Sequence, residues 1–350
     1  MRVTELKEGW TLYLVEPNFP YYRPYLQSFK PVQARVPGSV ISNLVQGGVI
    51  PDPFLRRYET SVQWVSDSDW VYKCSFAFEK DSALPNAVLR FEGLDTFAEV
   101  VLNGETIGKS ENFFVPLEID VSNLLQAGEN SLEVRLFSPV RVGVERRAEY
   151  FAKNNLPEDL VYFDERAFVR KPGYMFGWDW GPRLPDLGIW QPVKLLQFQT
   201  RISNLNIEVR EGDSEKFEVL ASGEGGEISF ELFGPEGDLL GSRVGSSARF
   251  QVENPRLWWP NGHGEQPLYT LKASLNGQEL VRRIGLRTAK LLREKDAIGE
   301  SFEFEVNGRK VWACGANWIP NDSFPARITR EDLRIQLTRY KSLNFNMLRV

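Results

Sequence analysis

Short segments that alternate apolar and polar residues recur along most of this 350-residue chain. In its first half they lie at 73–80, 87–93, 97–104 and 130–138. A period of two is typical of strands with one buried face, and Gly, Asn and Pro mark the turns between them. Strands that return about every ten residues favour an antiparallel sandwich of the jelly-roll or immunoglobulin-like kind. We expect Cys74 to lie in the core of this sandwich as a small apolar residue.

A second series of strands follows a change of pattern near residue 200. Its roughly 90 residues are the size of one immunoglobulin-like sandwich. We therefore expect a jelly-roll domain at 1–200 and an immunoglobulin-like domain at 201–291. The segments of this second series are 201–212, 216–223, 227–234, 247–255, 268–277 and 281–291.

The pattern changes again after the second series. An Asn-Gly pair at 307–308 predicts a type I′ hairpin. Leu333, Leu337 and Tyr340 recur at helical spacing, and 344–350 reads as a buried strand. Strand, helix and strand in this order predict a βαβ unit, which implies a parallel sheet.

A βαβ unit alone cannot cover both faces of a parallel sheet, and a complete (β/α)8 barrel needs about 250 residues. We therefore expect 292–350 to be the incomplete start of a TIM barrel, and the chain to be the front part of a larger protein. The predicted fold class is mostly β. Because an unfinished barrel exposes apolar surface and is prone to aggregate, we expect residues 1–290 alone to be more soluble than the whole chain.

Composition excludes several classes of protein. The chain has 42 basic and 47 acidic residues and a net charge of −5, without the basic runs that nucleic-acid binding needs. One His and two distant cysteines, Cys74 and Cys314, make neither a usual zinc or haem site nor a disulfide framework, so we expect no metal and no cofactor. No apolar run approaches the ~20 residues of a membrane span, and the first residues lack a signal-peptide core. We expect a cytoplasmic protein with no membrane partner.

The most unusual segment is an aromatic loop at 170–193, in which glycines and prolines predict the absence of regular structure. Asp179 lies between Trp178 and Trp180. This arrangement suits a sugar, because an indole ring stacks on a C–H face while a carboxylate accepts hydrogen bonds from two adjacent hydroxyls. The alternative, in which Asp179 caps a turn and the tryptophans are core residues, has equal weight. The other aromatic residues of the loop are Tyr174, Phe176 and Trp190.

Two other segments carry candidate residues. The segment 253–271 contains a Pro-Asn-Gly turn after a Trp pair, and we expect the chain's one histidine, His263, to be a solvated turn residue. In α/β barrels, functional residues follow the carboxyl ends of the strands. That rule selects Asn317, Trp318 and Asp322 after the first predicted strand, and Arg349 at the end of the second. A buried arginine needs a carboxylate partner, which we expect outside this chain. The alternative is a packing Trp and a structural ion pair.

Five motifs together resemble glycoside hydrolase family 2, specifically its β-mannosidase branch. FGWDWGP followed by GIWQPV is the most specific of them, and the resemblance covers essentially the whole chain. One small departure is the glycine-containing approach to the loop at 171–174. The other motifs, in chain order, are VPGSVISNLVQGGVIPDPF, GLDTFAEVVLNG, LWWPNGHGEQPLY, and CGANWIPND with NFNMLRV.

The resemblance implies a retaining β-mannosidase that removes terminal β-D-mannose, with a jelly-roll (galactose-binding-like) domain at its N-terminus. Such enzymes use two glutamates about 5–5.5 Å apart. The family places both on later barrel strands, so no catalytic residue carries over and we expect this chain to be inactive alone. Trp178 and Asp179 would contact the mannose, Trp318 would line the pocket, and Arg349 would help keep the nucleophile ionised.

Two further expectations concern partners. The expected partner is a mannoside or manno-oligosaccharide, and a homodimer stays open as the assembly. From a different class of function, the chain could instead be a non-catalytic carbohydrate-binding protein that uses the loop at 174–182. The predicted start of a barrel argues against that alternative, because a non-catalytic carbohydrate-binding protein does not need barrel strands.

Overall fold

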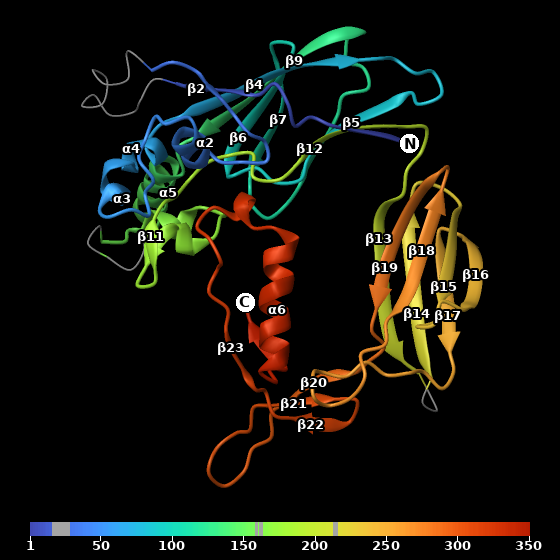
Figure 1. Cartoon of the computed structure of the whole chain (residues 1–350). Coiled ribbons are helices and arrows are strands. Elements are labelled where there is room, and N and C mark those ends of the chain that lie inside the picture. The colour runs from blue at the N-terminus through green and yellow to red at the C-terminus, as the bar shows by residue number, and fades with distance from the viewer. Residues whose placement is uncertain (16–28, 158–159, 161–163, 213–215) are drawn as a thin grey trace. The chain divides into compact units, whose positions relative to one another are not determined.

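The computed structural model describes residues 1–15, 29–157, 160, 164–212 and 216–350 (Figure 1). Strands dominate it, as the period-two pattern predicts. The chain divides into two compact units, which we describe separately. The N-terminal unit consists of residues 2–198 and 320–329, and the C-terminal unit consists of residue 1, 199–319 and 330–350.

The N-terminal unit is a sandwich of two antiparallel sheets. The six-stranded sheet has the order β3 (Val32–Gln33), β2 (Thr11–Leu14), β4 (Trp70–Phe78), β9 (Gly128–Phe137), β6 (Phe97–Leu102) and β7 (Glu105–Glu111). The four-stranded sheet has the order β1 (Arg2–Glu5), β12 (Val193–Phe198), β5 (Asn86–Phe91) and β8 (Leu117–Asp120). The four segments predicted in the first half correspond to β4, β5, β6 and β9.

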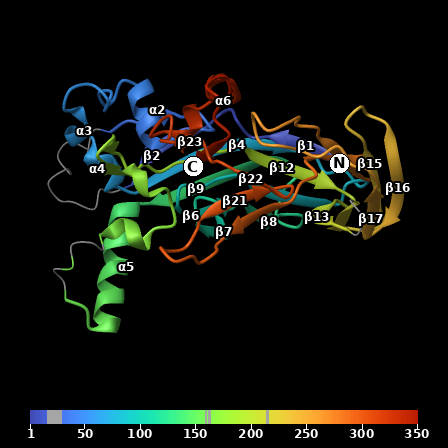
Figure 2. The same cartoon turned by 90° about the horizontal axis from the view of Figure 1, so that it is seen from below.

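Helices of this unit connect and flank the strands. The longest, α5, stands away from the sheets in the second view (Figure 2). A capping box formed by Ser39 and Ser42 begins α2. The helices are α2 (Val40–Gln46), α3 (Tyr58–Ser61), α4 (Gln63–Ser66), α5 (Pro139–Asn154), and the 3-10 turns η2 (Glu165–Phe168), η3 (Gly173–Met175) and η4 (Pro325–Arg327).

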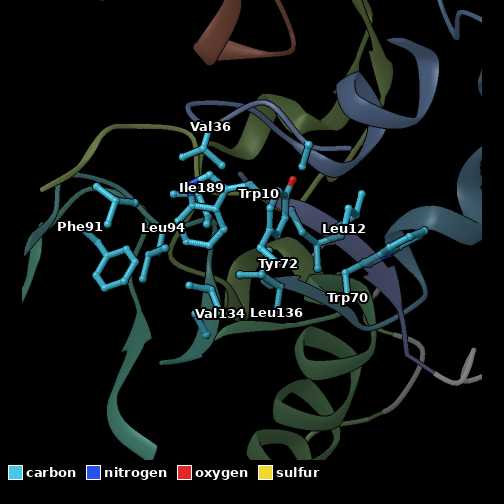
Figure 3. Close-up of a cluster of buried hydrophobic side chains, with 14 of the residues drawn as sticks. Trp10, Leu12, Val36, Trp70, Tyr72, Phe91, Leu94, Val134, Leu136 and Ile189 are labelled. Atoms are coloured by element: carbon cyan, nitrogen blue, oxygen red, sulfur yellow. The ribbon is translucent and has the colours of Figure 1, made fainter. Parts of the chain in front are cut away.

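Large aromatic side chains fill the space between the two sheets. Trp10 and Tyr72 meet edge to face, with ring centroids 6.4 Å apart, and aliphatic residues of the six-stranded sheet and of connecting segments lie around them (Figure 3). Their polar atoms are satisfied, because Trp10 Nε1 donates to the Leu6 carbonyl and Tyr72 Oη accepts from Asn43 Nδ2. Cys74 is buried in the same core and is not in a disulfide, so its predicted core position is confirmed.

The C-terminal unit contains the immunoglobulin-like sandwich. One sheet has the order β13 (Ser203–Glu211), β14 (Phe217–Glu224) and β17 (Ser247–Val252). The other has the order β16 (Leu239–Gly245), β15 (Ile228–Phe233), β18 (Tyr269–Leu275) and β19 (Gln278–Ile284). The sequence pattern does not reveal β16, because none of its residues is buried and it therefore shows no apolar alternation.

The last part of the chain forms a small sheet and a βαβ unit. At the predicted hairpin, Asn307 and Gly308 have φ angles of 49° and 73°, the two positive values that a type I′ turn requires. β23 (Gly315–Asn317) and β24 (Met347–Arg349) pair in parallel on either side of α6 (Arg330–Ser342). The small sheet consists of β20 (Ala289–Leu292), β21 (Glu303–Val306) and β22 (Arg309–Val311).

The prediction that 344–350 is a buried strand is wrong. Met347 is 38% exposed and Arg349 is also exposed. Within the described residues β24 pairs with β23 alone, in a two-stranded sheet, so most of its surface remains accessible. Among the described residues of α6, none is buried, including Leu337.

Residues 320–329 belong to the N-terminal unit although they lie far along the chain. Phe324 is only 2% exposed and is part of the core that Trp10 and Tyr72 dominate. A piece that ends at residue 290 lacks this side chain. The packing of Phe324 therefore argues against our expectation that residues 1–290 alone are more soluble than the whole chain.

We predict that a chain ending at residue 290 has a lower unfolding temperature for its N-terminal sandwich than the full chain. Loss of a buried Phe side chain from a core typically costs about 3–5 kcal/mol. Thermal unfolding followed by tryptophan fluorescence measures the difference, and Phe324→Ala in the full chain serves as the matched comparison. Equal unfolding temperatures for the shortened and full chains would contradict this assignment of Phe324 to the core.

Candidate functional site

The aromatic loop contains a short, regular hairpin. β10 (Phe176–Trp178) and β11 (Gly181–Arg183) pair antiparallel, with Asp179 and Trp180 in the turn. The prediction that glycine and proline exclude regular structure here is therefore wrong. Gly177 has a φ of +93°, and a Cβ at this position would lie 3.1 Å from Arg183 Cβ. Glycine thus permits the backbone conformation and the close approach of the two strands.

The side chains at the hairpin tip face solvent. Trp178 is 58% exposed, Trp180 is 41% exposed and Asp179 is also exposed. The alternative in which these tryptophans are core residues is therefore wrong. The guanidinium of Arg166 lies 5.4 Å from the Trp178 ring, within the range of a cation–π contact. The tip therefore presents two large aromatic side chains and a carboxylate to solvent.

Arg183 holds the base of the hairpin. Its guanidinium donates to Gln63 Oε1 at 2.6 Å and to Glu165 Oε1 at 2.8 Å. Its backbone amide donates to Glu59 Oε1 at 2.7 Å, and its carbonyl accepts from Gln63 Nε2 at 2.8 Å. Three separate helical turns therefore fix the strand that follows the exposed tip. This network connects the base of the hairpin to the surrounding helical turns.

A buried ionic cluster lies among the segments that flank the hairpin. Lys171 Nζ lies 2.9 Å from Asp95 Oδ1 and donates to the Asp186 carbonyl at 2.5 Å. The side chains of Lys171 and Asp95 are 0% and 5% exposed. Burial raises the pKa of Asp95, and the charge of Lys171 opposes that effect. Sequence reasoning missed this cluster, although Lys171 begins the 171–174 departure from the family pattern.

Asp186 accepts hydrogen bonds from two backbone amides. Its Oδ1 lies 3.0 Å from Ile41 N in α2 and 2.8 Å from Leu187 N. Burial raises the pKa of Asp186 to about 7. Its effect outweighs the opposite effects of the hydrogen bonds and of the positive charge of Lys171, both of which lower this pKa. Asp186 thereby links the start of α2 to the segment that leads from the hairpin into β12.

The other two candidate residues lie together in the C-terminal unit. The Trp318 amide donates to the Arg349 carbonyl at 2.7 Å, and the Trp318 ring meets Tyr340 edge to face at 5.5 Å. Arg349 Nη1 lies 3.3 Å from Asn317 Oδ1. The expectation of a buried Arg349 is wrong, because the two-stranded sheet leaves it exposed. Trp178 and Asp179 belong to the other unit, so the structure describes the candidates as two separate pairs.

The Trp-Trp-Pro-Asn-Gly turn contacts the βαβ unit. Asn261 Nδ2 lies 3.1 Å from both the Lys341 and the Phe345 carbonyls, and thus caps the end of α6. His263 is an exposed turn residue, as predicted, and its Nε2 lies 3.3 Å from Asn346 Nδ2. The sequence shows that this segment is a turn but does not show what the turn holds.

The part of the chain that the structure describes has neither a metal-binding cluster nor a helix able to span a membrane. It contains no group of three or more His, Cys, Asp or Glu side chains placed to hold a metal ion. Among the same residues, no helix has the length and apolar character that crossing a membrane requires.

Two family models match consecutive parts of the chain. The glycosyl hydrolase 2 galactose-binding domain-like model matches residues 23–191, which include the exposed hairpin. The glycosyl hydrolases family 2 model matches residues 195–287, which include the immunoglobulin-like strands. The chain belongs to glycoside hydrolase family 2. Both matched domains are β-sandwiches, in agreement with the mostly β fold.

Individual relatives of this family 2 chain are β-mannosidases. It is 34% identical to beta-mannosidase B of Thermothelomyces thermophilus over 327 residues, which are 86% of this chain and 37% of that protein. It is 34% identical to beta-mannosidase B of Emericella nidulans over 323 residues, which are 85% of this chain and 38% of that protein. The chain thus spans less than half the length of these relatives.

Two solved structures are also similar to this chain. A beta-D-mannosidase from Dictyoglomus thermophilum superposes with a TM-score of 0.86 at 37% identity, covering 100% of this chain and 44% of that one. A beta-glucuronidase from an uncultured Clostridium superposes with a TM-score of 0.65 at 18% identity, covering 99% of this chain and 54% of that one. The second similarity concerns the fold alone.

We predict that Arg183→Met loosens the hairpin. The variant keeps an apolar stem but loses the hydrogen bonds to Gln63 and Glu165, which together are worth roughly 1–3 kcal/mol after allowance for their partial exposure. Chymotrypsin should therefore cleave faster after Trp178 and Trp180, measured by mass spectrometry of limited digests. Arg210→Met, which removes an exposed ion pair with Glu208, is the control. Equal cleavage rates in the two variants would argue against the role of Arg183 in holding the base of the hairpin.

We also predict a pH effect at Asp186. Since its pKa in the folded chain is raised above the ordinary value, its contribution to stability is complete below about pH 4 and is lost as pH rises toward 7. Asp186→Asn removes this loss. The free energy of unfolding of the variant relative to the parent should rise between pH 4 and 7, by at most about 4 kcal/mol, and then stay level.

Urea unfolding at a series of pH values measures this difference. The exposed carboxylate of Asp238 supplies the control variant, Asp238→Asn. A difference between parent and Asp186→Asn that stays constant from pH 4 to 7 would show that Asp186 has an ordinary pKa.

Proposed function

We propose that this chain is the sugar-recognising front part of a retaining exo-β-mannosidase. The observation that carries the proposal is the exposed Trp178–Asp179–Trp180 tip on a domain that matches the family's galactose-binding-like model. The 37% identity to a beta-D-mannosidase over the whole chain supports mannose as the sugar. In this proposal the domains are 1–200, 201–291 and 292–350.

The proposed role of the tip follows from its chemistry. The Trp178 ring stacks on the C–H face of a terminal β-mannosyl residue. The Asp179 carboxylate accepts hydrogen bonds from two adjacent ring hydroxyls, and charge-assisted bonds of this kind are about twice as strong as neutral ones. The Arg183 network holds both side chains in place before the sugar binds. The partner is therefore a β-mannoside or a manno-oligosaccharide.

The βαβ unit supplies the other part of the proposal. We interpret β23, α6 and β24 as the first unit of a TIM barrel, in which functional side chains lie at the carboxyl ends of strands. Trp318 would form a wall of the sugar pocket, and Arg349 would lower the pKa of the nucleophilic carboxylate beside it. Two glutamates about 5–5.5 Å apart would perform the retaining reaction from later strands. This chain alone should therefore not hydrolyse mannosides.

The alternative function is carbohydrate binding without catalysis. The exposed tip favours it, because the tip and the clamp that holds it lie in one unit of this chain. Under either function the chain binds mannosides through Asp179. The two differ in what a longer protein would do, since only the enzyme needs the barrel strands. A cytoplasmic location and a homodimer stay predictions.

We predict that the purified chain binds methyl β-D-mannoside and that Asp179→Ala weakens the binding. Loss of hydrogen bonds to a charged acceptor costs about 1.5–3 kcal/mol, which is a roughly tenfold or larger rise in Kd. Calorimetric titration measures the Kd, and Asp238→Ala, at an exposed turn of the immunoglobulin-like domain, is the matched control.

Two outcomes would contradict the proposal. Equal Kd values for Asp179→Ala and Asp238→Ala would remove Asp179 from the sugar site. Release of a chromophore from a β-mannoside by the parent chain, at a rate that purification does not reduce, would show that the chain already contains its catalytic residues.

A further inference from the structure

A distant segment of the chain covers the N-terminal unit close to the hairpin. We call residues 320–329 the strap. The ring of Phe324 inserts into the sandwich core and meets Phe54 edge to face, with centroids 5.7 Å apart. The strap lies about 140 residues after the hairpin in sequence, so nothing in the local pattern connects the two.

The strap has a defined internal structure. Asp322 Oδ1 accepts from the Phe324 amide at 2.9 Å, and Asp322 Oδ2 accepts from Arg327 Nε at 2.9 Å and Nη2 at 2.6 Å. The Arg327 guanidinium lies 4.8 Å from the Phe324 ring and 5.4 Å from the Phe54 ring. These contacts fix the direction in which Phe324 enters the core.

Beneath the strap lies the root of the hairpin. A small cavity is lined by strap residues 323–326 together with Met175, Trp190 and Asp186. Met175 is fully buried and directly precedes β10. Its carbonyl accepts from the Leu184 amide at 2.8 Å, which closes the hairpin immediately beyond β11.

A second connection passes through Tyr174. Its ring lies 6.0 Å from the ring of Trp180 at the tip. Burial raises the pKa of Tyr174 to about 12, and the charges of Asp95 and of Asp322 in the strap add to the effect. Tyr174, which directly precedes Met175 at the root of the hairpin, therefore contacts the tip through Trp180.

From these contacts we propose that Phe324 is a positioning residue for the hairpin: by seating the strap over Met175, it fixes the root from which Trp178 and Asp179 project. The sugar-related part of this inference rests on the proposed function, whereas the packing part does not. Phe324 itself touches no sugar. Removal of its ring leaves a void beside Met175, and the hairpin gains freedom to move about its root.

The test uses the full chain with Phe324→Ala, the conservative variant Phe324→Leu, and Phe304→Ala as a control. Phe304 lies in β21 of the C-terminal unit and is 38% exposed. Amide hydrogen exchange under native conditions is followed at Leu184 and β11, and compared with β9 in the sandwich core. We expect at least tenfold faster exchange at Leu184 and β11 in Phe324→Ala, near-parent rates in Phe324→Leu, and no change in Phe304→Ala.

Two results would overturn the proposal. One is parent-like exchange at Leu184 in Phe324→Ala. The other is an acceleration at Leu184 and β11 no greater than the one at β9, because the loss of core stability expected for this variant would account for it without any separate effect on the hairpin. Calorimetric titration with methyl β-D-mannoside should show at least a threefold rise in Kd for Phe324→Ala.

Failure of the inference and failure of the proposed function are distinguishable. Hydrogen exchange reports the hairpin without any sugar. If exchange responds as expected but the parent chain binds no mannoside, the positioning role stands and the sugar assignment is wrong. If the parent binds mannoside and Phe324→Ala leaves both exchange and Kd unchanged, the positioning role is wrong.

Discussion

The buried ion pair between Lys171 and Asp95 connects the hairpin to the sheet region of the N-terminal unit. Moving an ion out of water costs several kcal/mol, so its partners must be in place whenever the sandwich is folded. Those partners come from two distant segments, since Asp95 precedes β6 and the Asp186 carbonyl follows the hairpin. Lys171 and its partners thus join the segment before β6 to both flanks of the hairpin that carries Trp178.

Sequence patterns were sufficient for several of the strands that have one buried face. β4, β9 and the strands of the second sandwich repeat every two residues, and their core positions follow from that repeat. β16 was missed because it has no buried residue. Lys171 and Phe324 were missed for a different reason. Their partners lie tens to hundreds of residues away, and neither residue belongs to a periodic segment that would indicate burial.

The sequence selected candidate residues but not their geometry. The FGWDWGP motif selected Trp178 and Asp179, whose role stays a prediction, and it did not show that the turn is a paired hairpin or that Arg183 holds its base. At the other pair, the sequence placed each candidate at the end of its own strand, and in the structure the Trp318 amide donates to the Arg349 carbonyl. The rule for barrel strands also implied burial, which requires neighbouring strands on both sides. Burial is a property of a whole sheet, whereas the position of a residue at a strand end is a property of the segment itself.

The place of the strap in the chain has a consequence for synthesis. The last strand of the N-terminal sandwich ends at Phe198, and Phe324 follows about 125 residues later. At ~5–20 residues per second, a ribosome needs roughly 6–25 s to cover that distance. During this interval the sandwich is complete in its strands but open at the pocket that Phe324 fills. Newly made chains therefore pass through a period in which an apolar opening is available to chaperones or to other nascent chains.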